Sequence, residues 1–74
     1  MTETIEAATL MVNGVAEPLE ATTVAALLAA RDIAPDGRGV AVALNGAVVR
    51  RAAWATTALN PGDSVEIVRA MQGG

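Results

Sequence analysis

Two Asn-Gly pairs constrain the fold of this 74-residue chain more than any other feature. Each pair lies between two apolar runs: Asn13-Gly14 between 9–12 and 15–19, and Asn45-Gly46 between 40–44 and 47–49. A two-residue Asn-Gly connection in this setting is the strongest short-range signal for a β-hairpin. The sequence therefore predicts four strands in two hairpins. We expect the strand 15–19 at a sheet edge, because Pro18 has no amide to donate to a second neighbour.

A single helix is predicted over 24–31, between the two hairpins. Thr22 and Thr23 are both competent N-caps, and strong helix formers follow them. The larger apolar residues recur at positions i, i+3 and i+4, which gives one apolar stripe for packing on a sheet. Pro35, Gly37 and Gly39 predict that the chain beyond the helix is a loop.

A fifth strand is predicted at 64–68, after the β-turn sequence Asn60-Pro61-Gly62-Asp63. Val65 and Ile67 should face the core. The less regular stretch 50–59 is expected to form one short helical turn, with Trp54 as a core element. The predicted fold class is α+β, with five strands and one main helix that covers a sheet face. We expect one domain over 9–69, a disordered extension over 1–8 and a flexible tail over 70–74.

The composition restricts both the core and the chemistry. Hydrophobic residues make up 53% of the chain, but 17 of them are alanine and Trp54 is the only aromatic residue, so the core must be thin and aliphatic. The net charge of −3 argues against a nucleic-acid partner. The longest uncharged run of the predicted helix, 21–30, is too short for a membrane span, and the acidic first residues do not form a signal peptide. We expect a soluble, cytoplasmic protein.

Catalytic material is scarce. The chain has no His, Cys, Lys or Tyr, and its eight carboxylates are expected to form a solvated surface. Asp32 and Asp36 make a weak candidate metal pair, so no metal site is predicted. Arg50-Arg51 is either an exposed pair at a strand end or a partner contact. The sequence therefore predicts a carrier or binding protein and not an enzyme.

The C-terminal Gly73-Gly74 is the remaining candidate for chemistry. Glycine has no Cβ, so such a terminus can enter a channel too narrow for other residues. An α-carboxylate is ionised at neutral pH and can attack an activated phosphate. Transfer of AMP to it would open the terminal carbonyl to sulfur or amine nucleophiles. Gly74 is therefore the predicted site of modification, and the other residues are expected to present it.

The second half of the chain carries a combination of motifs: Val42-Ala43-Leu44-Asn45-Gly46, Val48-Val49-Arg50-Arg51-Ala52-Ala53-Trp54, Leu59, Gly62-Asp63, Val65-Glu66-Ile67-Val68 and Gly73-Gly74. In this combination the chain resembles the ThiS family of ubiquitin-like β-grasp sulfur carriers, over about residues 9 to 74 and most strongly from Val40 onward. The resemblance implies the β-grasp fold, a mixed five-stranded sheet packed on one main helix. In two places the chain departs from the family: Arg50 stands where a proline is common, and residues 1–8 exceed the usual start.

The resemblance implies a function and a set of partners. A ThiF-type adenylyltransferase would use ATP and Mg²⁺ to adenylate Gly74, and no cofactor would be bound by the chain itself. A cysteine desulfurase or rhodanese-like donor would supply sulfur for a thiocarboxylate, and a ThiG-type thiazole synthase would receive it for thiamine synthesis. The arm threaded into these partners would be Arg69, Ala70, Met71, Gln72 and Gly73.

Two alternatives stay open. The first is a β-grasp carrier of another pathway, such as molybdopterin, cysteine or secondary-metabolite synthesis. Molybdopterin carriers usually place prolines before the diglycine, and Ala70-Met71-Gln72 has none. The second is a β-grasp interaction module whose terminus is chemically inert.

Overall fold

A computed structural model describes residues 8–33 and 38–69 of the chain. The elements follow the predicted order of two strands, a helix and three strands, with one short 3₁₀ turn. They are β1 (Thr9–Val12), β2 (Val15–Pro18), α1 (Val24–Ala30), β3 (Val40–Leu44), β4 (Ala47–Val49), η1 (Arg51–Ala53) and β5 (Ser64–Arg69). The predicted strands 15–19 and 64–68 differ from β2 and β5 by one residue each. Both Asn-Gly turns have positive φ at both residues, as their hairpins require.

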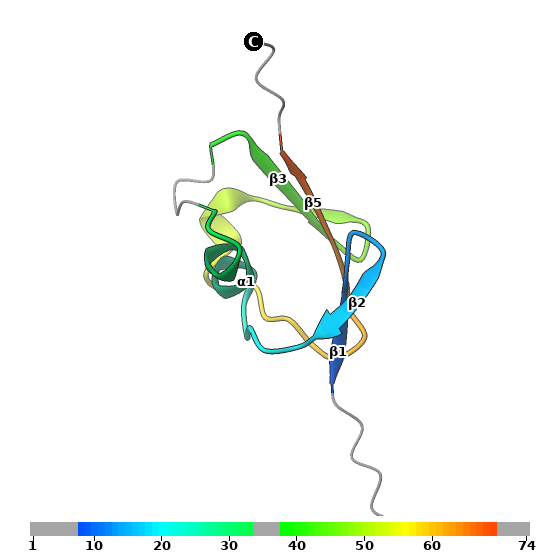
Figure 1. Cartoon of the computed structure of the whole chain (residues 1–74). Coiled ribbons are helices and arrows are strands. Elements are labelled where there is room, and N and C mark those ends of the chain that lie inside the picture. The colour runs from blue at the N-terminus through cyan, green and yellow to red at the C-terminus, as the bar shows by residue number, and fades with distance from the viewer. Residues whose placement is uncertain (1–7, 34–37, 70–74) are drawn as a thin grey trace, which may run out of the picture.

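The five strands form one mixed sheet in the order β2-β1-β5-β3-β4. β1 and β5 are parallel, whereas the three other neighbouring pairs are antiparallel. The last strand of the chain is therefore the central strand of the sheet (Figure 1). The predicted edge position of the Pro18 strand is confirmed, because β2 has β1 as its only neighbour in the sheet order.

The core lies between one face of the sheet and α1 (Figure 1). Val24 of the helix and Val65 of β5 have no exposed surface, and Ile67 packs against the same cluster. Trp54 is 5% exposed, which confirms it as a core element. The buried residues are Leu10, Val12, Val24, Leu27, Leu28, Ile33, Val42, Trp54, Leu59 and Val65.

The N-terminus of α1 is held by the segment that follows η1. The Val24 amide donates to Thr57 O at 3.0 Å and the Ala25 amide donates to Trp54 O at 3.0 Å. Thr23 is the N-cap, since its hydroxyl oxygen accepts from the Ala26 amide at 3.1 Å. These bonds satisfy donors that a helix leaves unpaired in its first turn. A seven-residue helix is too short to be stable alone, so this support and its packing hold it in place.

The C-terminus of α1 is a Schellman motif centred on Asp32, which has a φ of 62°. The Ile33 amide donates to Leu28 O at 3.0 Å and the Asp32 amide donates to Ala29 O at 3.1 Å. The helix thus ends at Ala30, one residue before the predicted end at Arg31. Arg31 caps it and forms an ion pair with Glu17 of β2.

The predicted terminal extension and tail fall almost wholly outside the described residues. Residues 1–7 and 70–74 lie there, as does part of the predicted loop, 34–37. Ala8 is described, and its carbonyl accepts from the Leu19 amide at 2.9 Å. Ala8, the last residue of the predicted extension, is therefore hydrogen-bonded to the residue that follows the edge strand β2.

Candidate functional site

The site begins with β5, because this strand leads to the predicted functional residues. Its pairing with β3 runs from Leu44 opposite Val65 to Val40 opposite Arg69. Its pairing with β1 covers only Ser64 and Val65. The second half of β5 therefore has a strand neighbour on one side only. Arg69 is exposed at its end, and the remaining predicted site residues, Ala70, Met71, Gln72, Gly73 and Gly74, lie outside the described residues.

The Asn13 side chain takes the place of the missing strand neighbour. Its Oδ1 accepts from the Ile67 amide at 2.8 Å, and its Nδ2 donates to Ile67 O at 3.3 Å. The Asn13 amide also donates to Val65 O at 2.9 Å. The first hairpin turn thus continues the hydrogen bonding of β5 to within two residues of Arg69.

Asn45, in the second hairpin turn, holds the start of the same strand. Its Oδ1 accepts from the Ser64 amide at 2.9 Å, and its Nδ2 donates to Asp63 Oδ1 at 3.1 Å. This bond to Asn45, together with the bond from the Asn60 amide, lowers the pKa of the Asp63 carboxyl below its ordinary value of 3.8. The sequence reasoning assigned both asparagines to turns and missed their side-chain role. The signal for this role was the residue type. Glycine alone would have provided the positive φ, whereas asparagine adds a side-chain amide that can form hydrogen bonds.

Several arginines lie around the end of β5. The sheet register places Arg69 beside Val40 and places Val49 beside Val42, so Arg50 and Arg51 follow β4 at the same end of the sheet. Both are exposed, which is compatible with either interpretation of this doublet, an exposed pair at a strand end or a partner contact. Arg50 has a φ of −65° and a ψ of 146°. These are values that proline adopts, so arginine keeps the backbone path that the family's proline would take.

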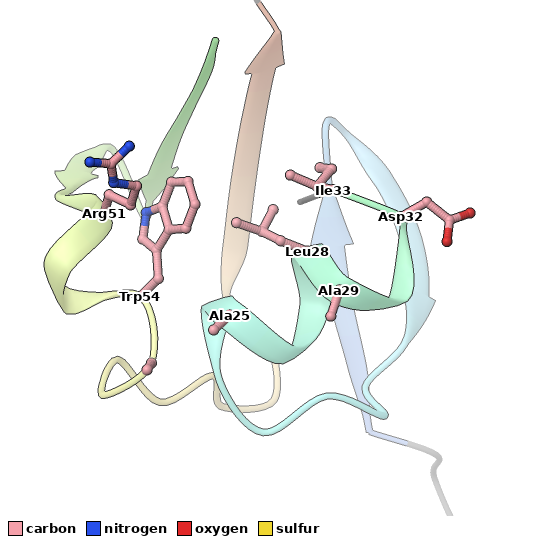
Figure 2. A pocket seen from close by; sticks show the side chains of 8 residues that line it. Ala25, Leu28, Ala29, Asp32, Ile33, Arg51 and Trp54 are labelled. Carbon is pink, nitrogen blue, oxygen red and sulfur yellow. The ribbon is translucent and has the colours of Figure 1, made fainter. Parts of the chain in front are cut away.

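An apolar groove opens between α1 and η1 near this end of the molecule. Its volume is about 630 Å³. Figure 2 shows Trp54 and Arg51 on one side of it and Leu28, Ile33 and Asp32 on the other. Three alanines, Ala25, Ala29 and Ala55, leave the space open. The sequence reasoning did not identify this groove, although small residues at helix positions i and i+4 were a signal for it.

The sheet face opposite α1 is also partly apolar. Residues that pair across strands share a face, and this face carries Val48 opposite Ala43 and Val68 opposite Ala41. Val48 is 79% exposed and Val68 is 61% exposed. An apolar area therefore lies beside the strand that leads to the predicted tail.

The described residues contain no group of three or more His, Cys, Asp or Glu side chains arranged to hold a metal ion. Asp32 points outward at the groove rim (Figure 2), and Asp36 of the weak candidate pair lies outside the described residues. Within the same ranges, no helix is long and apolar enough to cross a membrane.

Comparison with known proteins assigns the family. The family model described as "ThiS family" matches residues 2–74. The chain is similar to the crystal structure of a thiamine biosynthesis protein (ThiS) from Geobacter metallireducens, with 36% identity and a TM-score of 0.73 over 89% of this chain and 99% of the other. A solution structure of a thiamine biosynthesis protein from the same organism has the same identity and TM-score over 89% and 87% of the two chains. No curated protein matches the chain. The mixed sheet on one helix is the β-grasp fold, as expected, and the chain belongs to the ThiS family.

Proposed function

We propose that this chain is a sulfur carrier protein for the synthesis of the thiamine thiazole, a co-substrate of enzymes and not an enzyme itself. The observation that carries the proposal is the family match over residues 2–74. Both similar structures are those of thiamine biosynthesis proteins. The fold is consistent with this role, because the central strand is held by both hairpin turns and leads to the predicted arm at Arg69.

The proposed chemistry takes place at the carboxylate of Gly74. A carboxylate oxygen attacks the α-phosphorus of ATP, which a ThiF-type partner holds with Mg²⁺, and pyrophosphate leaves. The terminal sulfur of a persulfide on a cysteine desulfurase or rhodanese-like donor then attacks the acyl carbon and displaces AMP, which gives an acyl disulfide between Gly74 and the donor. A second thiol attacks the donor's sulfur in this disulfide, so that the thiocarboxylate leaves and a disulfide remains between the two thiols. The resulting thiocarboxylate passes its sulfur to a ThiG-type thiazole synthase. ATP is a cytoplasmic substrate, and we place the carrier in the cytoplasm.

The residues of the arm have separate roles in this proposal. Gly73 and Gly74 have no side chains, so they fit a narrow channel that leads to the nucleotide. Residues Arg69 to Gln72 span the distance between the domain and the partner's active site. Neither β5 nor its hydrogen bonds take part in the reaction. They determine the position from which the arm extends.

Intact-mass analysis tests the proposal. The full chain is incubated with its activating enzyme, ATP, Mg²⁺ and a sulfur donor, and we expect a mass gain equal to the exchange of one oxygen for sulfur. A variant with one alanine added after Gly74 should gain nothing. The matched control carries one alanine before Met1 and should react like the unmodified chain. A mass gain in the variant extended after Gly74 would contradict the assigned site.

The acceptor is tested separately. The thiocarboxylate form is mixed with a thiazole synthase and its other substrates, and we expect thiazole product and return of the carboxylate mass. An inert thiocarboxylate in this assay, combined with sulfur transfer to a molybdopterin precursor by its synthase, would assign the carrier to the other pathway.

A further inference from the structure

We propose that the open edge of β5 at Arg69 is a docking site for an extended segment of the activating enzyme, which adds to the sheet as a short strand. This docking strand takes the place that β1 leaves open beyond the first hairpin turn, and it continues beside the arm. The groups that bind it are backbone amides and carbonyls, so the segment is recognised by its extended conformation. The inference rests on the proposed function, because it states how the activating enzyme holds the arm.

The hydrogen bonds of β5 give the direction of the Arg69 amide. Val65 O accepts from the Asn13 amide at 2.9 Å, and the Ile67 amide donates to Asn13 Oδ1 at 2.8 Å. Both groups therefore point to the β1 side of the strand. The backbone groups of every second residue in a strand point the same way, so those of Arg69 also point to the β1 side. Val40 of β3 lies opposite Arg69 in a pair that exchanges no hydrogen bonds.

The β1 side of Arg69 is open. β1 pairs with β5 only up to Val65, and the Asn13 side chain extends the hydrogen bonding to Ile67. Figure 1 shows that β5 runs past the turn between β1 and β2. A Cβ atom placed on Gly14 in this turn would meet no atom within 4 Å. Among the residues that the structure describes, none accepts a hydrogen bond from the Arg69 amide. An exposed strand edge of this kind is a template for a further strand.

The length of the arm identifies the activating enzyme as the source of this strand. The predicted site, Gly74, lies five residues beyond Arg69, and five extended residues span at most about 17 Å. In the proposed function Gly74 reaches a nucleotide enclosed by the enzyme, so the backbone of the enzyme lies beside the arm within this distance. Residues 70–74 include no proline, so each amide of the arm can donate a hydrogen bond.

The Asn13 side chain determines where the docking strand begins. It occupies both the amide and the carbonyl of Ile67, so an added strand cannot pair at this residue without displacing it. The next residue with backbone groups on the same side is Arg69. In an extended arm, residues 71 and 73 present their backbone groups on this side as well. The pairing therefore starts at Arg69 and has a single register along the arm.

Hydrogen exchange tests the docking strand directly. The full chain is labelled with ¹⁵N, and exchange of its amides is compared with and without a saturating amount of the activating enzyme, in the absence of ATP. We expect exchange of the Arg69 amide to slow by about tenfold or more in the complex, because the amide gains an acceptor. The Ile67 amide is the internal reference, since Asn13 already accepts from it in the unbound chain.

Two results of this experiment would overturn the proposal. The first is an unchanged exchange rate of the Arg69 amide in the saturated complex. The second is a slowing in the chain alone that increases with its concentration, which would assign the open edge to pairing with a second copy.

Adenylation kinetics test the same hydrogen bond. Arg69→Pro removes the amide donor, whereas the matched variant Arg69→Ala loses the same charge and keeps the amide. We expect kcat/KM of Arg69→Pro to lie about ten- to hundredfold below that of Arg69→Ala, because an acceptor of the enzyme is left unpaired. Ala70→Pro places the same ring in the arm but removes an amide that faces the other side, so it should lose less than Arg69→Pro. Urea unfolding shows whether each variant folds. Equal losses in Arg69→Pro and Ala70→Pro would assign the effect to the ring and overturn the docking strand.

The outcomes separate the two proposals. If the unmodified chain is never adenylated, the proposed function fails and the docking strand fails with it. If the unmodified chain is adenylated and Arg69→Pro has the same kcat/KM as Arg69→Ala, only the docking strand fails.

Discussion

The Asn13 side chain forms two hydrogen bonds with the backbone of Ile67, a residue 54 positions later in the chain. The amide nitrogen and oxygen of Asn13 act as a strand neighbour would, at 3.3 and 2.8 Å. They meet β5 where β1 has already ended in its turn. One side chain therefore serves both the first hairpin and the strand that leads to the predicted arm.

Replacing Asn13 by glycine should loosen β5 without disturbing the turn. Glycine accepts the positive φ of this position, so the loss is confined to the side-chain bonds and some backbone entropy. We expect the free energy of unfolding to fall by about 1–2 kcal/mol. The measurement is urea unfolding, together with hydrogen exchange of the Ile67 amide, which should lose protection.

Asn13→Asp is the matched control for this prediction. Aspartate keeps an oxygen that accepts from the Ile67 amide and loses only the donor that makes the longer bond. It should therefore retain more amide protection than Asn13→Gly. Equal protection of the Ile67 amide in the glycine variant and the unmodified chain would show that Asn13 does not hold β5.

Asp63 should make the stability depend on pH in the acidic range. Its bonds to Asn45 and the Asn60 amide lower the pKa of the folded state below the ordinary value of 3.8. Because the pKa of the Asp63 carboxyl is lower in the folded state than in the unfolded state, its ionised form stabilises the folded state at pH values above the unfolded-state pKa. This stabilisation is lost as the pH falls through the folded-state pKa. We expect the free energy of unfolding, measured by urea titration from pH 5 downward, to fall below about pH 4.

The Asn45→Gly variant isolates this effect. It keeps the positive φ of the turn but removes the bond that contributes most to the lowered pKa of Asp63. Below about pH 4, the free energy of unfolding should fall less steeply with decreasing pH than in the unmodified chain. An identical pH profile in both proteins would contradict the assigned cause. Asp63→Asn should remove the Asp63 contribution altogether.

Asp32→Gly should stabilise the domain. Asp32 holds a φ of 62° at the end of α1, a position where glycine carries no steric penalty. The Schellman bonds are made by backbone groups and remain available. We expect the midpoint of urea unfolding to rise, with a gain of about 0.5–1 kcal/mol, because the relief of left-handed strain exceeds the backbone entropy that glycine adds to the unfolded chain. A loss of stability would indicate that the Asp32 side chain contributes more than its backbone conformation costs.

The hairpins and the main helix were predictable because their signals are local. Asn-Gly turns dictate positive φ, and Pro18 limits its strand to an edge, both confirmed here. The place of β5 between β1 and β3 joins residues more than 20 positions apart, and only the family resemblance implied it before the structure. The end of α1 at Ala30 was predicted one residue too late, because the turn that closes the helix has aspartate at Asp32, where glycine is the usual residue with positive φ.

The candidate site was predictable to a smaller degree. Both interpretations of the arginine doublet stay open, and its position at the same end of the sheet as Arg69 depends on the register of β3 with two other strands. The groove depends on the approach of η1 to α1, and its local signal was limited to the small residues Ala25 and Ala29 on one wall. Gly74 stays a prediction from the sequence, because it lies outside the described residues.

Arg50→Pro tests whether the family's proline and this chain's arginine share one backbone conformation. The φ of −65° at Arg50 equals the value that the proline ring imposes, and the ψ of 146° is also favourable. Within the described residues, the Arg50 amide donates no backbone hydrogen bond that proline would remove. Proline restricts the unfolded chain, so we expect a gain of about 0.4–1 kcal/mol in the free energy of unfolding.

The matched control, Arg50→Ala, removes the same charge without restricting φ and should change stability by less than about 0.5 kcal/mol. Destabilisation by proline relative to alanine, measured in parallel urea titrations, would show that the turn after β4 differs from the conformation described here.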